Sequence, residues 1–448
     1  MTTAEAVSWA IGETDAPLPP MAPGRLPFLG HALSMRKDPL RYFVDLYQTL
    51  GPIFRVQVMN DVITVMAGPE ANRFTTRHDD EAFTNVVEFR GLSEEIGPVF
   101  TAMPPEPHRY MRRLMRPAYA KSAATPHLDD LIGVTNDFLG RVVVGGSFEV
   151  FPTMQEIVVN QLGYMMFDRP AGDYFEDFRR FMLTLLEVHQ FKMKPRWMLH
   201  LPGYRKAKAR AFAMAEEVLT HVRSTHPGED RPSNAIDILL DAEDAEGQPF
   251  SEAALLAEAM APYLAGQDTV AGTMAFICYT LHKYPDVLAR VQAEVSEHFD
   301  PIDPSMENLR RLDTLHRAIV ETMRRYPVAI SMPRHAARSF AFAGYRVDAG
   351  AHVYSATAVT HFLPEFYAAP YTFDIDRPRG PSGSYAPFGV GNYTCLGAGI
   401  AEVQLLTTAA ALLAHGRFEL DPPDYEAKLA TIPLPNPGRY RLRLVERY

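Results

Sequence analysis

The sequence has few cysteines: its 448 residues contain only Cys278 and Cys395. Two cysteines cannot build a disulfide framework, so we expect a reducing compartment and a cytoplasmic protein. The first residues, MTTAEAVSWAIGETDAPLPPM, carry acids and prolines where a signal peptide has a basic and then an apolar run. This stretch therefore predicts no secretory leader.

An excess of positive charge and long apolar runs are also missing. The formal net charge is −10, which argues against a nucleic-acid-binding protein. A membrane span needs about 20 consecutive apolar residues. The nearest approach, residues 255–281, is interrupted by Glu258, Pro262 and Asp268. We interpret it as a long buried helix and expect no integral membrane anchor.

What is present is the composition of a globular protein, with 47% hydrophobic and 22% charged residues. No linker, low-complexity tract or repeat interrupts the chain, so we expect a single domain over residues 1–448. Residues 1–20 are expected to be flexible, and the chain is expected to stay irregular until about Pro39. Residues 51–68 alternate and are rich in Val and Ile, which predicts a β-hairpin that turns at residues 59–61.

The rest of the pattern predicts a mainly α fold with small β-sheets. Residues 106–330 mostly follow the period of a helix, whereas residues 340–358 return to strand character. Residues 362–388 are irregular and rich in Pro, Tyr and Phe. A helix over 397–416 is expected to end at Gly416, and the tail YRLRLVERY is expected to form a closing strand.

The stretch FGVGNYTCLG surrounds Cys395 with three glycines, Gly389, Gly391 and Gly397. A cysteine just before a helix is favoured as a thiolate by the helix dipole, and a thiolate is a soft ligand of metals such as haem iron. The glycines allow the loop to lie against a flat ring. A buried structural cysteine in a turn is the alternative. The pattern F-x-x-G-x-x-x-C-x-G arises by chance in a chain this long on the order of once in a thousand sequences.

This loop resembles the haem-binding loop of the cytochrome P450 family. The resemblance implies the P450 fold, with haem b between the long central helix and the cysteine-loop helix. It implies that Cys395 is the axial iron ligand and that Phe388, Gly389 and Gly397 shape the loop. Tyr393 stands where the family usually carries a basic residue for a haem propionate, and a phenol brings one hydrogen bond but no charge.

The segment LAGQDT, residues 264–269, resembles the family's oxygen-activating motif. The resemblance implies that Thr269 hydrogen-bonds dioxygen, that Asp268 relays protons to it, and that Ala265 adjoins the haem. A threonine in mid-helix can donate to the carbonyl four residues earlier, here that of Ala265. A locally capped buried acid beside an unremarkable threonine is the alternative, and Pro262 should kink the helix one turn earlier.

The segment ETMRRYP places Glu321 and Arg324 three residues apart on a helix. Such pairs are common and weak on exposed helices, so a surface pair is one interpretation. In the family the corresponding pair is buried and joined by a second arginine, which here matches Arg377. The resemblance implies that these three residues form a structural brace for the haem loop.

The segment PPEPHRYMRRLMRPAY matches the family's H-x-x-x-R motif at His108 and Arg112. The resemblance implies that both hold haem propionates, together with Arg334. The alternatives are an ordinary partly buried histidine and one more charge of a solvated face. A basic face here would attract an acidic ferredoxin as electron donor, which a ferredoxin reductase supplies with electrons. We expect it to dock near Arg109, Arg113 and Arg116.

Together the motifs imply a haem-thiolate monooxygenase that hydroxylates a hydrophobic small molecule with O2 and two electrons. Terpenoid, steroid, fatty-acid-like and alkyl-aromatic substrates fit the largely apolar pocket segments. The expected pocket residues are Leu264, Val328, Ile330 and Ile432. A peroxygenase or isomerase of the haem-thiolate type and a non-catalytic haem sensor remain alternatives. Cys278 matches no motif, and we expect it to pack in the core.

Overall fold

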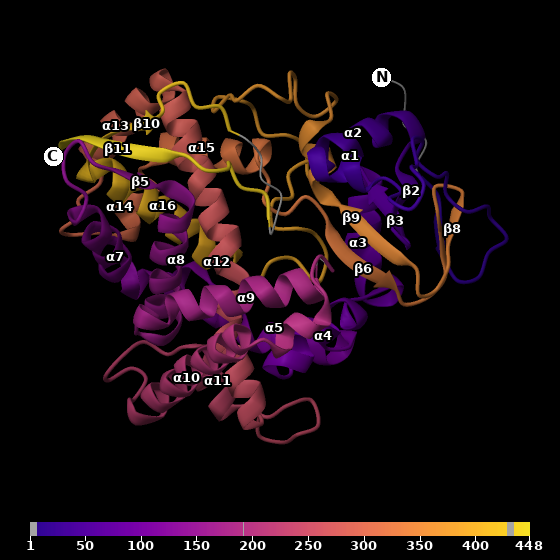
Figure 1. Cartoon of the computed structure of the whole chain (residues 1–448), viewed down its shortest axis with the longest axis horizontal. Helices are drawn as coiled ribbons and strands as arrows, with labels where there is room; N and C mark the ends of the chain where they lie inside the picture. Colours follow the sequence, from indigo (N-terminus) through magenta and orange to yellow (C-terminus); the bar gives the residue numbers. More distant parts are fainter. Residues whose placement is uncertain (1–6, 191, 428–433) are drawn as a thin grey trace. The chain divides into compact units, whose positions relative to one another are not determined.

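The computed structural model describes residues 7–190, 192–427 and 434–448 and contains two compact units. Unit 1 consists of residues 1–90, 101–109 and 329–395. Unit 2 consists of residues 91–100, 110–328 and 396–448. Figure 1 shows both with the chain coloured along its sequence. The single domain expected from composition stays a prediction, and each unit is described separately.

Unit 1 is built on a five-stranded sheet in the order β2-β3-β9-β6-β4. Its pairs are antiparallel except for the parallel pair β3–β9. The predicted hairpin is confirmed, because β2 and β3 pair across the turn at Met59 and Asn60. The strands are β2 (Ile53–Val58), β3 (Asp61–Ala67), β4 (Phe83–Thr84), β6 (Met332–Ala336) and β9 (His352–Ala356).

Both faces of this sheet are buried, which explains why β3 reads as an almost continuous apolar run. Phe54 and Val65 pack in one cluster with Phe43 of helix α2 (Pro39–Leu50). On the other face, Ile53 packs in a cluster with Phe74 of helix α3 (Pro69–Ala82). The sheet is therefore the core of unit 1.

A second sheet of unit 1, in the order β1-β7-β8, corrects the expectation for the N-terminal residues. Strand β1 (Trp9–Ile11) pairs antiparallel with β7 (Phe340–Phe342), which in turn pairs with β8 (Tyr345–Val347). A helix, α1 (Ala32–Lys37), also forms before Pro39. Residues 9–11 are thus not flexible coil, because they complete a sheet whose other strands lie far along the chain.

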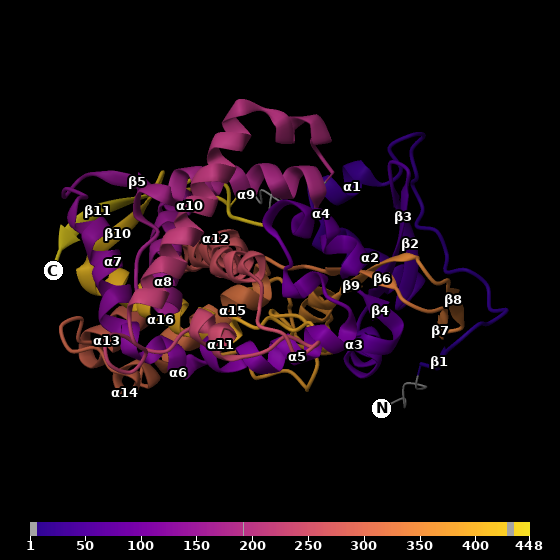
Figure 2. The same cartoon turned by 90° about the horizontal axis from the view of Figure 1, so that it is seen from below.

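Unit 2 is helical and is organised around α12 (Glu252–Lys283), which Figure 2 shows among its neighbours. This helix packs against α8 (Val150–Phe167), α10 (Pro202–Ser224), α15 (Asp313–Arg325) and α16 (Ala398–His415). The predicted long buried helix is confirmed, and it continues through Pro262. The remaining α-helices of the described residues are α4 (Val86–Ile96), α5 (Pro105–Met115), α6 (Lys121–Ala124), α7 (Leu128–Gly140), α9 (Phe175–His189), α11 (Ala235–Asp241), α13 (Pro285–His298) and α14 (Met306–Arg310).

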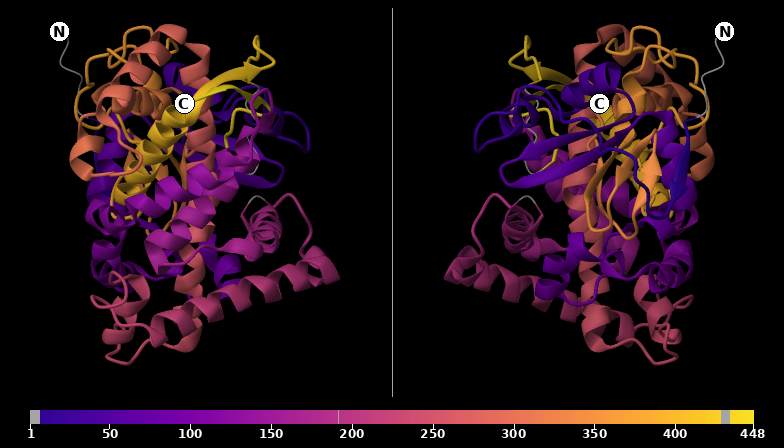
Figure 3. Two further views of the ribbon diagram at one scale, coloured as in Figure 1. Left: turned by 90° about the vertical axis from the view of Figure 1, so that its left-hand side faces the viewer. Right: turned by 90° about the vertical axis from the view of Figure 1, so that its right-hand side faces the viewer.

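The C-terminal part of unit 2 confirms the predicted helix and closing strand (Figure 3, in yellow). Helix α16 passes at Gly416 directly into β10 (Gly416–Asp421), which pairs with β11 (Arg441–Arg447). Strand β5 (Ser147–Glu149) completes this sheet. By length and composition alone α16 is apolar enough to cross a membrane, but 61% of it is buried inside the protein. That burial is typical of a core helix.

A long irregular segment precedes α16 in the chain. After the short 3-10 helix at Thr357–Phe362, residues 363–397, all of them described, contain neither helix nor strand. The predicted irregular segment is therefore confirmed. Its ordered shape depends on turns and on contacts with the sheet of unit 1, and it ends in the cysteine loop.

Candidate active site

The cysteine loop is a tight turn closed by its own backbone. The Cys395 N–H donates to the carbonyl of Phe388 over 2.9 Å, and the Gly389 N–H donates to Ala386 over 3.1 Å. Gly389 and Gly391 have φ angles of 78° and 79°, which favour glycine over any residue with a side chain. Cys395 is exposed and stands two residues before Gly397, the N-cap of α16.

The two left-handed glycines are also required by their neighbours. A Cβ at Gly389 would overlap the sulfur of Met332 on β6, and a Cβ at Gly391 would overlap the carboxylate of Asp79 on α3. The loop backbone therefore lies directly against β6 and α3. Sequence reasoning explained these glycines by the approach of a flat ring, whereas the structure adds a packing reason within unit 1.

Arg334 is fully buried beside this loop and is held by two side chains that no motif had indicated. Its guanidinium donates to Asn85 Oδ1 over 3.1 Å and to Asp79 Oδ2 over 3.3 Å. Burial lowers the pKa of Arg334, and the charge of Asp79 opposes that shift. Burial raises the pKa of Asp79 to about 6, against the lowering effects of Arg334 and of the Tyr393 backbone N–H.

Three of the predicted propionate contacts come together in unit 1. The His108 ring stacks on the Tyr393 ring with 4.0 Å between centroids, and the Arg334 guanidinium lies 4.9 Å from the centroid of the Tyr393 ring. His108 is buried and stacked on Tyr393, whereas the alternative interpretation was an ordinary partly buried histidine. Arg112 is half-buried and lies one turn further along α5.

These residues fit the carboxylates and the iron of a haem. Tyr393 Oη is buried and has no hydrogen-bond partner among the described residues. Burial raises the pKa of Tyr393 to about 12, so the phenol keeps its proton and can donate near neutral pH. Arg334 adds a fixed positive charge, and Cys395 presents an exposed sulfur two residues from Tyr393. The loop that the motif indicated therefore carries a hydrogen-bond donor and a soft ligand, and a cation lies beside its Tyr393 ring.

In unit 2 the segment LAGQDT, residues 264–269, occupies the middle of α12. The Thr269 hydroxyl donates to the carbonyl of Ala265 over 2.7 Å, which confirms the hydrogen bond expected from the sequence. Ala265 is exposed and Thr269 half-buried, although the surrounding turns of α12 are largely buried. A Cβ at Gly266 would overlap Leu162 of α8, so this glycine permits close helix packing.

Asp268 is turned toward α8, where Gln155 Nε2 donates to its Oδ1 over 2.6 Å. Burial raises the pKa of Asp268, and the hydrogen bond from Gln155 partly opposes this shift. The shortest hydrogen bond to Asp268 comes from another helix, and the neighbouring Gln267 Nε2 lies 3.5 Å from the same oxygen, so the capping of this acid is not only local. Sequence reasoning missed Gln155, since nothing in the spacing of α8 singles it out from other glutamines.

A second buried acid on α12 was also missed. Glu258 accepts a hydrogen bond from Tyr119 Oη over 2.9 Å, and burial raises its pKa to about 7. Position 258 lies seven residues before Ala265, close to two helical turns, so both fall on the same side of α12. The signal in the sequence is an acidic residue inside an otherwise apolar helical run.

The expected brace is partly visible. Arg324 and Glu321 form a buried bidentate pair with distances of 2.7 and 2.8 Å, so the surface-pair interpretation is wrong. Arg377 donates to the backbone carbonyls of Ala368, Ala369 and Thr372. The pair belongs to unit 2 and Arg377 to unit 1, and their joint role stays a prediction.

The remaining predicted positions divide into described and undescribed ones. Leu264, Val328 and Ile330 are half-buried, and Ile432 lies outside the described residues. Cys278 is buried in the core as expected, and burial raises its pKa to about 12.

The predicted docking face is less uniformly basic than its sequence indicates. Arg109 pairs with Asp80 over 2.9 Å, which compensates its charge. Arg113 and Arg116 are exposed, and neither forms an ion pair within the described part of the chain. The positive charge available to a partner is therefore concentrated on these two residues.

Comparison with known proteins agrees with this arrangement. The family model described as Cytochrome P450 matches residues 19–439. The chain is 26% identical over 418 residues to a cyclooctat-9-en-7-ol 5-monooxygenase of Streptomyces melanosporofaciens, covering 90% of this chain and 89% of that protein. It is 23% identical over 439 residues to a pentalenene oxygenase of Streptomyces avermitilis, covering 95% and 97%.

Solved structures share the fold. The haem domain of cytochrome P450DA matches with a TM-score of 0.83 at 22% identity, covering 97% of this chain and 98% of that one. Cyanobacterial CYP120A1 with retinoic acid bound matches with a TM-score of 0.81 at 22% identity, covering 96% and 100%. The chain belongs to the cytochrome P450 family and has the P450 fold. It is a haem-dependent monooxygenase, an oxidoreductase that incorporates one oxygen atom from O2.

Proposed function

We propose that the protein hydroxylates an apolar small molecule of terpenoid or sterol type, with electrons from a ferredoxin and its reductase. Relatives named as cyclooctat-9-en-7-ol 5-monooxygenase, pentalenene oxygenase and sterol 14alpha-demethylase support this substrate class. The observation that carries the haem assignment is the cluster of Arg334, Tyr393 and His108 beside the cysteine loop. The low cysteine content supports a cytoplasmic location.

The residues of unit 1 have the task of holding the cofactor. Haem, when bound, supplies the activation of O2 that no amino-acid side chain provides. Cys395 offers the sulfur ligand, and Tyr393 Oη, Arg334 and His108 offer hydrogen bonds and charge to the propionates. Asp79 keeps the guanidinium of Arg334 in place from within the protein. An uncharged residue at position 393 is compatible with propionate binding because Arg334 lies over the Tyr393 ring and supplies the positive charge.

The residues of α12 have the task of handling protons. The Thr269 hydroxyl proton is directed to the carbonyl of Ala265, so the hydroxyl oxygen is left to accept a hydrogen bond from a donor beside it. Asp268 holds a proton to higher pH than an ordinary aspartate. Gln155 donates to Oδ1, so the proton of the neutral acid lies on Oδ2, from which it can pass to water. Gln155 therefore positions the acid between deliveries.

Electron delivery is assigned to the exposed cations near α5. Arg113 and Arg116 attract an acidic ferredoxin through long-range charge, and such steering weakens as salt increases. Arg109 contributes less because Asp80 pairs with it. Reduction by a ferredoxin should therefore slow with salt in the wild type and less so in an Arg113→Gln, Arg116→Gln variant, with Arg109→Gln as the matched control.

The cofactor assignment is tested by a carbon monoxide spectrum of the reduced protein. The wild type should show the red-displaced band that thiolate ligation causes. Cys395→Ala should lose this band while Cys278→Ala, the matched control, should keep it. A normal thiolate band in Cys395→Ala, or the absence of haem from the wild type, would contradict the proposal.

The substrate assignment is tested by titration with diterpene hydrocarbons, sesquiterpene hydrocarbons and sterols, following the Soret band as water leaves the iron. A ligand that shifts the band should give a hydroxylated product only with ferredoxin, reductase, NADH and O2. Product formed from peroxide alone at the same rate would favour the peroxygenase alternative. Binding without product under either condition would favour the sensor.

A further inference from the structure

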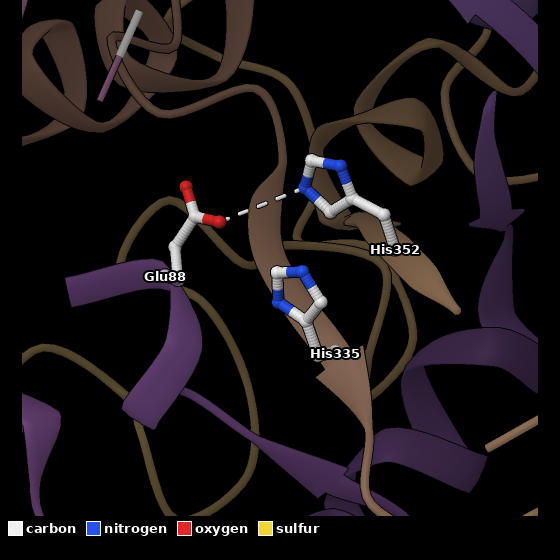
Figure 4. Close-up of side chains that lie close together, drawn as sticks. All are labelled: Glu88, His335 and His352. Atoms are coloured by element: carbon white, nitrogen blue, oxygen red, sulfur yellow. Dashed lines mark ion pairs between the residues drawn. The ribbon is translucent and has the colours of Figure 1, made fainter. Parts of the chain in front are cut away.

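A second candidate site lies in unit 1, on the sheet that also carries Arg334. Glu88, His335 and His352 each offer one ligand atom, and these atoms all lie within 4.8 Å of one another. Figure 4 shows the two imidazole rings one over the other, with the Glu88 carboxylate facing them. We propose that these three side chains bind a zinc ion, which fastens the first turn of α4 to strands β6 and β9.

The backbone holds the two histidines in place. His335 on β6 and His352 on β9 are direct partners in the antiparallel register, a position in which side chains lie close together. Their rings stack with 4.8 Å between centroids and 5° between planes. Because side chains alternate along a strand, His335 points to the opposite face from its neighbour Arg334. The candidate zinc site and the propionate cluster therefore use opposite faces of β6.

The surroundings of His352 are those of a metal ligand. Its Nδ1 lies 2.9 Å from Asp61 Oδ2, so the carboxylate fixes the ring with Nε2 directed away from Asp61. Nε2 is buried, lies 3.7 Å from Glu88 Oε2 and has no hydrogen-bond partner within the described residues. A carboxylate that orients a histidine whose other nitrogen faces further ligands is the usual second shell of a zinc site.

The choice of metal follows from the ligands. Two imidazoles and one carboxylate, completed by water, form a tetrahedral ligand set that zinc accepts, whereas calcium and magnesium prefer oxygen alone. Tetrahedral zinc with bonds of about 2.0–2.1 Å needs ligand atoms about 3.3–3.5 Å apart. The 3.7 Å between His352 Nε2 and Glu88 Oε2 is already close to this value. Because a metal lies in the plane of each imidazole that binds it, the two parallel rings must turn out of their stacked arrangement to close the site.

Another group of potential ligands serves as the matched control. His127, Asp130 and Asp168 of unit 2 also bring their ligand atoms within 4.8 Å. This group has a single imidazole, and His127 Nδ1 already interacts with Asp130, three residues further along the chain. With one imidazole ligand in place of two, this group is not expected to bind zinc tightly.

The experiment measures zinc binding to untagged, haem-loaded protein after dialysis against a chelator. The wild type should bind one zinc per chain, and zinc-edge X-ray absorption, to which iron does not contribute, should detect two imidazoles at about 2.0–2.1 Å. His335→Gln and His352→Gln should each weaken binding at least 100-fold. Asp61→Asn, which keeps all three ligands, should weaken it about 10- to 100-fold. His127→Gln should leave binding unchanged.

Structural consequences give an independent measurement. Zinc should raise the thermal midpoint of the wild type and slow hydrogen exchange at the amides of α4, but should do neither in His352→Gln. Circular dichroism without zinc shows whether each variant is folded. If a histidine variant does not fold, the zinc affinity of Asp61→Asn, which keeps all three ligands, tests the proposal in its place. Wild-type stoichiometry in the His335→Gln, His352→Gln double variant, or loss of zinc in His127→Gln, would overturn the proposal.

Discussion

The contact between Gly391 and Asp79 leads to a quantitative prediction about the cysteine loop. Gly391 has φ 79° and lies where a Cβ would overlap the Asp79 carboxylate, whereas Gly383 has φ 84° and has no atom within 4 Å of such a Cβ. An alanine in the left-handed region costs about 1–2 kcal/mol at either position. Gly383→Ala should therefore lower the free energy of unfolding by about 1–2 kcal/mol and no more.

Gly391→Ala should cost more, because the methyl group displaces the Asp79 carboxylate. That carboxylate interacts with Arg334 over 3.3 Å and accepts from the Tyr393 N–H over 3.3 Å. Disturbing buried, charged hydrogen bonds costs about 1–3 kcal/mol. The total loss expected for Gly391→Ala is therefore about 2–5 kcal/mol.

Urea unfolding of both haem-loaded variants, followed by far-UV circular dichroism, measures this difference. Without the Asp79 carboxylate, Gly391→Ala should no longer cost more than Gly383→Ala. The double variant Asp79→Ala, Gly391→Ala should therefore show a coupling free energy of about 1–3 kcal/mol between the two sites. Equal losses for Gly391→Ala and Gly383→Ala, or strictly additive effects in the double variant, would refute the reasoning.

Three further predictions follow from buried or exposed titratable groups. Burial raises the pKa of Glu258 to about 7, so the contribution of its protonated form to stability is complete below its ordinary pKa and is lost as pH rises through 7. Between pH 4.5 and 8 the free energy of unfolding of Glu258→Gln should therefore rise by about 3 kcal/mol relative to that of the wild type, as measured by urea unfolding. A difference that does not depend on pH would contradict this. In haem-free protein iodoacetamide should alkylate the exposed Cys395 and spare the buried Cys278, and haem should protect Cys395; mass spectrometry would refute this by finding Cys278 labelled first. Gln155→Leu removes a hydrogen bond that lowers the pKa of Asp268, so the pH profile of product formed per NADH should move to higher pH, and an unchanged profile would exclude titration of Asp268 during turnover.

The sequence by itself determined the features that depend on neighbours along the chain. The hairpin of β2 and β3, the long helix α12 and the helix α16 were all predictable, because a strand and a helix impose periods that a short window contains. The position of Cys395 before α16 and the pairing of Glu321 with Arg324 follow from local spacing in the same way.

Tertiary structure alone decided which distant residues meet. Arg334 contacts Asp79, 255 positions away, and Asp268 contacts Gln155, 113 positions away. Strand β1 has only three residues and forms because β7, more than 300 positions later, supplies its hydrogen bonds. The rings of His335 and His352 stack because antiparallel register places them opposite each other. No local period encodes such pairs, since they arise when the packing of apolar faces brings separate elements together.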